Sequence, residues 1–79
     1  MNATTQAIIE RLPRKPLLNP QEVSDAYGLK TPDPILADIK TGKLAANRVG
    51  GKYIISRSAA EAYIAANEYK PQEGTVKRP

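Results

Sequence analysis

Five basic side chains follow one another between residues 40 and 57, with no acidic residue among them. They are Lys40, Lys43, Arg48, Lys52 and Arg57. Ammonium and guanidinium groups clustered in this way attract polyanions and displace their bound counterions. A run of like charge also occurs on ordinary solvated faces, and the sequence alone leaves both interpretations open.

The rest of the charge is divided unevenly along the 79 residues, whose net charge is +4. Residues 1–15 and 70–79 each carry +2, so residues 16–69 are neutral as a whole. Within that neutral stretch, residues 20–38 carry −3 and residues 40–57 carry +5. An acidic segment therefore precedes the basic run.

Most catalytic chemistry is excluded by composition. The chain has no His and no Cys, which removes histidine-dependent triads, Cys-based zinc sites and disulfides. Glu22 and Asp25 are the nearest approach to paired carboxylates, and a solvated helix face explains them better than a metal or acid–base site. We therefore expect no catalytic residue, no metal, no cofactor and no enzymatic activity.

No apolar run approaches the roughly 20 residues that span a bilayer, and no signal-peptide core opens the chain. We therefore expect no membrane partner and a cytoplasmic, nucleoid-associated location.

A first helix is predicted at about 20–27. Asn19 is a good N-cap, Pro20 suits the first helical position and Glu22 completes a capping box. Val23 and Ala26 lie on one face, and Gly28 supplies the left-handed residue that ends a helix.

A second helix is predicted at about 34–41, burying Ile35, Leu36 and Ile39. Two prolines restrict its start. Either Thr31 caps it with Pro32 inside, or Asp33 caps it with Pro34 inside. A helix, a short turn and a second helix describe both a helix-turn-helix and a plain helical hairpin.

A two-stranded hairpin is predicted next, because β-capable residues flank Gly50 and Gly51. Ser56 then caps a third helix at about 57–68. We divide the chain into an N-terminal basic arm (1–15), a single domain (16–69) and a disordered basic tail (70–79). The arm holds Arg11, Arg14 and Lys15, and one or two helical turns at 4–12 remain an open alternative.

The stretch 17–64 resembles the MerR-like winged helix-turn-helix domains of excisionases, which are recombination directionality factors of phages and mobile elements. The resemblance rests on Leu18-Asn19-Pro20-Gln21-Glu22-Val23, Gly28-Leu29, Thr41-Gly42-Lys43-Leu44, Arg48-Val49-Gly50-Gly51-Lys52-Tyr53-Ile54-Ile55 and Glu61-Ala62-Tyr63-Ile64. It implies a mainly α fold with a small β-hairpin, the wing, placed between the second and third helices.

The resemblance also implies a function. Excisionases are non-catalytic proteins that bind duplex DNA as several adjacent copies, bend it and help an integrase excise the element. Some also regulate transcription. A small transcription regulator of the same fold, and a protein-interaction module for an acidic partner, remain the alternatives.

The resemblance assigns the candidate DNA contacts to three places. Lys30, Thr31, Ala37 and Lys40 belong to the recognition helix and its turn, Lys43, Arg48, Gly50, Gly51 and Lys52 to the wing, and Arg57 to the start of the third helix. Asp33 and Asp38 depart from the family pattern, because a carboxylate near phosphate is repulsive. Strand alternation exposes Ile54, which is either an ordinary exposed apolar side chain or, together with Asp38, part of a contact with a neighbouring copy.

Overall fold

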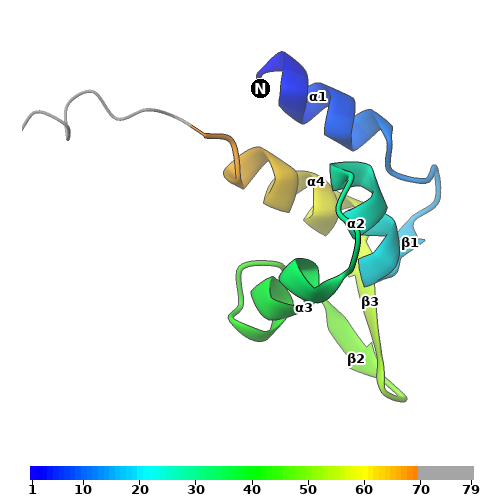
Figure 1. Cartoon of the computed structure of the whole chain (residues 1–79). Coiled ribbons are helices and arrows are strands. Elements are labelled where there is room, and N and C mark those ends of the chain that lie inside the picture. Colours follow the sequence, from blue (N-terminus) through cyan, green and yellow to red (C-terminus); the bar gives the residue numbers. More distant parts are fainter. Residues whose placement is uncertain (70–79) are drawn as a thin grey trace, which may run out of the picture.

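Four helices and three short strands make up residues 1–69, the part of the chain that the structure, a computed structural model, describes. In chain order they are α1 (Ala3–Glu10), β1 (Leu17–Leu18), α2 (Pro20–Tyr27), α3 (Asp33–Lys40), β2 (Asn47–Val49), β3 (Lys52–Ser56) and α4 (Arg57–Ala66). The β2–β3 hairpin extends away from α1 (Figure 1). The predicted tail at 70–79 lies outside the described residues.

Helix α2 begins and ends at the predicted residues. The Asn19 side chain accepts a hydrogen bond from the Glu22 backbone N–H at 2.8 Å, and the Glu22 carboxylate accepts one from the Asn19 N–H at 2.9 Å. Gly28 ends the helix at φ 78°, in the left-handed region that favours glycine. These local signals fix where the helix begins and ends, and burial of Val23 and Ala26 in the core stabilises it.

Helix α3 begins at Asp33, directly after Pro32. The Thr31 hydroxyl accepts from the Asp33 N–H at 3.4 Å, as in the Thr31 alternative, although Pro32 precedes the helix and does not lie inside it. The turn before the helix is also held from α2, where the buried Ser24 hydroxyl donates to the Thr31 carbonyl at 2.8 Å. Pro34 in the first turn needs no hydrogen-bond acceptor, which lowers the need for a cap.

The sheet has the strand order β1–β3–β2 and is antiparallel throughout. Gly50 and Gly51 have φ angles of 57° and 81°, as a two-residue hairpin loop requires, so the predicted hairpin is confirmed. Strand β1 was not predicted. Two leucines carry no alternating pattern, and their pairing with Ile55 and Ser56 depends on a contact distant in sequence.

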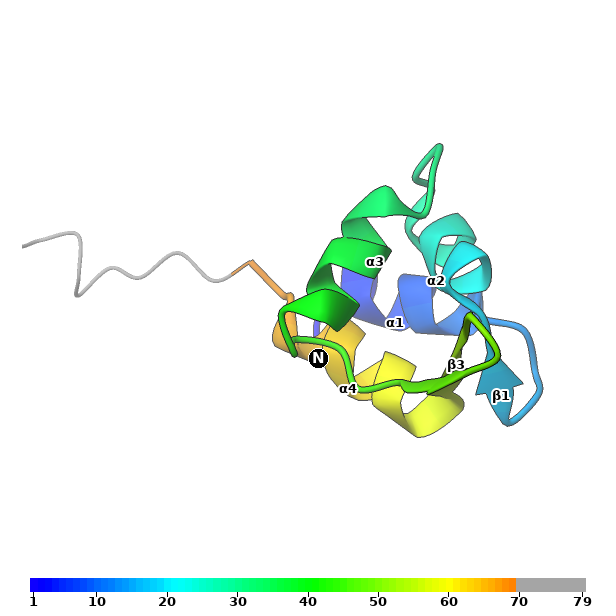
Figure 2. The same cartoon turned by 90° about the horizontal axis from the view of Figure 1, so that it is seen from below.

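The N-terminal segment is part of the folded domain, which corrects the predicted boundary at residue 15. Helix α1 contacts α2 and α4 (Figures 1 and 2), and Thr5 and Leu12 are buried. Asn2 caps the helix by accepting from the Thr5 N–H at 2.8 Å. Residues 3–12 therefore complete the core instead of forming a separate arm.

The core lies where the helices meet β3. Its buried apolar side chains are Leu12, Leu18, Val23, Ala26, Ile35, Leu44, Ile55, Ala60, Tyr63 and Ile64. Leu36 and Ile39, which the helical pattern predicted as buried, are only half-buried. Helix α4 begins under the predicted Ser56 cap, whose hydroxyl accepts from the Ala59 N–H at 3.0 Å, and ends at Ala66 rather than 68.

One polar bond joins α3 to α4. The Tyr63 hydroxyl donates to the Asp38 carboxylate at 2.5 Å, and the Tyr63 ring meets the Tyr27 ring edge-on at 6.0 Å. Burial, and then the neighbouring Asp38 carboxylate, raise the pKa of the Tyr63 hydroxyl. The fold therefore favours the neutral phenol.

Tyr63→Phe removes this bond and leaves Asp38 without its donor. We expect the free energy of unfolding, measured by urea titration at pH 7, to fall by about 1–3 kcal/mol. In the folded wild type the Tyr63 hydroxyl keeps its proton, whereas in the unfolded chain it loses that proton above about pH 10. The difference in unfolding free energy between wild type and Tyr63→Phe therefore becomes smaller as pH rises above about 10. An unchanged difference at pH 7 and pH 11 would contradict the assignment.

Glu22→Gln tests the start of α2. Lys15, 2.6 Å from the Glu22 carboxylate, is the main cause that lowers the pKa of Glu22, and the Asn19 N–H adds to it. Stability from the ionised carboxylate is present above the ordinary glutamate pKa and disappears as pH falls through the lowered value. We expect wild type to exceed the variant in unfolding free energy at pH 6 and to match it near pH 3.

Candidate nucleic-acid interface

The outward face of α3 consists of the residues that do not pack into the core. Ile35 is buried, while Asp33, Ala37 and Lys40 follow at helical spacing on the exposed side. A helix face with a small central side chain and a cation at its end can approach a groove of duplex DNA closely. Ala37 and Lys40 thus lie where the sequence prediction required.

The hairpin presents two more cations. Arg48 on β2 and Lys52 on β3 are exposed and flank the Gly50–Gly51 loop. The Arg48 guanidinium lies over the Tyr53 ring, 5.0 Å from its centroid, and its Nη1 donates to the Tyr53 hydroxyl at 3.1 Å.

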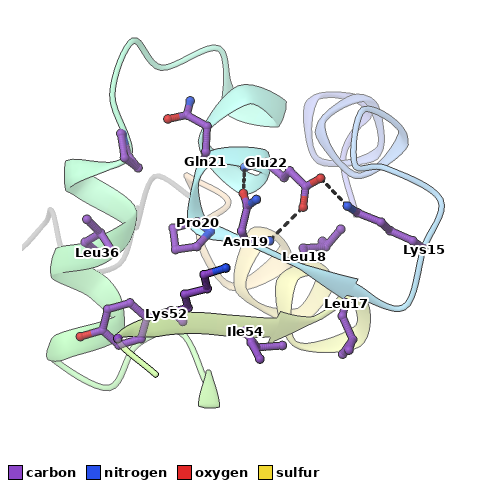
Figure 3. A pocket seen from close by; sticks show the side chains of 13 residues that line it. Lys15, Leu17, Leu18, Asn19, Pro20, Gln21, Glu22, Leu36, Lys52 and Ile54 are labelled. Carbon is purple, nitrogen blue, oxygen red and sulfur yellow. Dashed lines mark hydrogen bonds and ion pairs between the residues drawn. The ribbon is translucent and has the colours of Figure 1, made fainter. Parts of the chain in front are cut away.

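A groove of about 710 Å³ separates α3 from the hairpin. Pro32 and Leu36 form its α3 side, and Lys52 and Ile54 form its β3 side. The start of α2 lies between them, and Figure 3 shows the Lys52 ammonium pointing toward Pro20. Helix α3 and the hairpin are thus two walls of one concave surface.

Five exposed cations on α3, its flanking turns and the hairpin form no ion pair among residues 1–69, and one of them, Lys52, lines the groove. They are Lys30, Lys40, Lys43, Arg48 and Lys52. They are not one compact cluster: Lys30 precedes α3, Lys40 and Lys43 lie at and after its end, and Arg48 and Lys52 lie on the hairpin. Such an arrangement suits an extended polyanion better than a single small anion.

Arg57 differs from the prediction, because its side chain serves the fold. It is half-buried, and its Nε donates to the Glu61 carboxylate at 2.9 Å. Its Nη1 donates to the Pro13 carbonyl at 2.6 Å and lies 3.4 Å from the Leu12 carbonyl. Arg57 therefore ties the end of the α1 segment to α4 and is removed from the candidate contacts.

Two cations of the predicted arm, Arg11 and Arg14, are not among the residues that line the groove, whereas Lys15 is one of them (Figure 3). Arg11, Arg14 and Lys15 belong to the segment between α1 and β1, on the far side of α2 from α3 (Figures 1 and 2). Lys15 is paired with Glu22, and the Arg11 guanidinium lies beside Gly28. Arg14 is exposed.

The two residues predicted to contact a neighbouring copy are both engaged within this chain. Asp38 is half-buried and accepts from Tyr63, so its carboxylate does not project outward. Ile54 is half-buried along the groove, which Leu17 also lines, instead of standing exposed. Strand alternation alone could not show this, because the groove walls come from α2 and α3.

Thr31, Gly50 and Gly51 are exposed where predicted, in the turn before α3 and at the hairpin tip. Sequence reasoning missed Tyr53 and Leu36 as surface residues. A signal for Tyr53 existed, since a two-residue loop at Gly50 and Gly51 places position 48 opposite position 53.

Comparison with protein-family models, with curated proteins and with solved structures finds no match for this chain. Among the described residues there is no group of three or more acidic, His or Cys side chains that could hold a metal ion. None of their helices is long and apolar enough to cross a membrane.

Arg57→Ala should lower the free energy of unfolding by about 1–3 kcal/mol, because it removes the donor of the Glu61 carboxylate and one of the two donors of the Pro13 carbonyl, which keeps the Lys15 N–H. Arg57→Lys keeps the charge and loses the forked geometry, so we expect only partial recovery. Urea unfolding measures both. Equal stability of Arg57→Ala and wild type would show that these contacts contribute nothing.

Proposed function

We propose that this chain binds duplex DNA without catalysis, as a winged helix-turn-helix protein. In this proposal α2 and α3 form the helix-turn-helix, the β2–β3 hairpin is the wing, and α4 closes the domain. The order of elements and the shared groove between α3 and the hairpin support it. If α2 and α3 were only a helical hairpin, the basic β2–β3 hairpin beside α3 would have no explanation.

The observation that carries the proposal is the set of unpaired cations on α3, its flanking turns and the hairpin. Two acidic side chains are ion-paired within the molecule, Glu61 with Arg57 and Glu22 with Lys15. The basic side chains around the groove keep their charge free for an external polyanion. This is the expected electrostatic footprint of a protein that neutralises phosphates.

The surface of α3 supports a recognition role. Asp38, which a DNA-facing helix would present to phosphate, turns inward to Tyr63. Asp33 stays exposed at the first residue of the helix, where the helix dipole favours a carboxylate. The remaining outward residues are Ala37, whose methyl suits contact with a thymine methyl group, and Lys40, which suits phosphate or guanine.

Within DNA binding, we propose an excisionase-like role: adjacent copies bind preferred sites, bend the duplex and help an integrase excise a phage or mobile element. This part rests on the resemblance of residues 17–64 to that family. A transcription regulator of the same fold would use the same surface, because fold does not determine function.

One observation favours a different function. The groove is lined largely by apolar side chains, including Leu36, Pro32 and Ile54, with Lys52 among them. Apolar walls with a cation suit an acidic segment of a protein partner as well as a DNA backbone. Salt dependence on duplex DNA separates the two functions.

Fluorescence anisotropy on a labelled duplex over a salt series tests the DNA proposal. Five phosphate contacts predict a log–log slope of about −4 to −5. We expect Arg48→Ala/Lys52→Ala to weaken binding and to reduce the slope by about 1.8. The matched control, Arg11→Ala/Arg14→Ala, removes the same charge away from the groove and should change the slope less. If the wild-type protein does not bind the DNA duplex at about 50 mM salt, the proposal is wrong.

Cooperative occupancy tests the excisionase-like role. On a duplex with tandem copies of a selected site, we expect laddered gel shifts in which the second copy binds more tightly than the first, and bending in a circular-permutation assay. Strictly independent occupancy of unbent DNA would favour the transcription-regulator alternative.

A further inference from the structure

We propose that Tyr53 is a positioning residue that holds the Arg48 guanidinium in place for contact with nucleic acid. This inference deepens the proposed DNA-binding function and rests on it. In this proposal Tyr53 does not contact DNA itself. Its ring and hydroxyl stabilise one conformation of the Arg48 side chain.

The hairpin register brings the two side chains together. Val49 and Lys52 flank the two-residue loop, and the next pair along the strands is Arg48 opposite Tyr53. A pair that flanks such a loop is hydrogen-bonded, so the next pair is the non-hydrogen-bonded kind, in which side chains come closest. The contact between Arg48 and Tyr53 thus follows from the pairing of β2 with β3.

The Tyr53 ring is a firm support for the guanidinium. It is half-buried along the groove, and the neighbouring Ile55 on the same strand is fully buried. Two interactions hold Arg48 on it: the guanidinium lies 5.0 Å from the ring centroid, and Nη1 donates to the hydroxyl at 3.1 Å. A free arginine side chain loses substantial rotamer entropy on binding, and this support removes part of that loss beforehand.

The contact also leaves Arg48 able to bind. A guanidinium has five N–H donors, and only one is given to another described residue. The others remain for a phosphate or a base edge. Arginine presented in this way is suited to a narrow minor groove or to bidentate phosphate contact.

A positioning role has a distinctive signature in the salt series. Tyr53→Leu removes the ring and leaves every charge in place, so we expect two- to fivefold weaker DNA binding with an unchanged salt slope. Arg48→Ala should instead reduce the slope by about 0.9. Tyr53→Phe keeps the ring and loses the hydroxyl bond, so its loss should be smaller than that of Tyr53→Leu.

A double-mutant cycle tests whether Tyr53 acts through Arg48. In the Arg48→Ala background, Tyr53→Leu should cause no further loss of affinity. In the Lys52→Ala background, the matched control on the same hairpin, it should keep its full two- to fivefold effect. An equal loss in both backgrounds would overturn the inference, because Tyr53 would then contact DNA or shape the groove itself.

The inference also has a test without DNA. Side-chain ¹⁵N relaxation of Arg48 Nε should show restricted motion in wild type and increased motion in Tyr53→Leu, with melting temperatures confirming that the variant is folded. Equal mobility in the two proteins would overturn the positioning role. A restricted Arg48 in a protein that ignores DNA would leave the positioning intact and reject the proposed function, so the two failures are distinguishable.

Discussion

The junction between β3 and α4 is the constraint on which the rest of the molecule depends. The strand passes into the helix with no loop, and Ser56 caps the helix while pairing with Leu17. At the next residue the Arg57 N–H donates to the Pro16 carbonyl at 2.8 Å, and the guanidinium reaches the carbonyls of Leu12 and Pro13. One short segment therefore determines where the hairpin, α4 and the α1 segment lie relative to one another.

This constraint has an electrostatic consequence. The junction gives Glu61 a partner in Arg57, the start of α2 gives Glu22 a partner in Lys15, and Asp38 receives the Tyr63 hydroxyl. These three acidic groups thus have partners within the described part of the chain, whereas the exposed cations of α3, its flanking turns and the hairpin form no ion pair among residues 1–69.

Prediction from sequence was accurate where the signal is local. The capping box at Asn19, the left-handed Gly28 and the two-glycine hairpin each depend on residues within four positions of one another, and each is present. Prediction was inaccurate where a distant element decides the outcome. The start of α3 depends on Ser24, strand β1 depends on Ile55 and Ser56, and α1 is ordered by packing on α2 and α4. The same division holds for the candidate site: Ala37 and Lys52 are exposed as expected, whereas Arg57 and Asp38 are bonded within the chain and Ile54 is half-buried.

The sequence by itself determined the identity of the helices and the hairpin, the absence of His and Cys chemistry, and a basic run after an acidic one. Propensity, capping and net charge are properties of neighbouring residues, so they can be read along the chain. Only the tertiary structure decided which charges are free. A side-chain hydrogen bond or a cation–π contact depends on distances between residues far apart or on facing strands, as between Arg57 and the Leu12 carbonyl or between Arg48 and Tyr53. Folding engages Arg57 and Asp38 in bonds within the chain and places Tyr53 against Arg48.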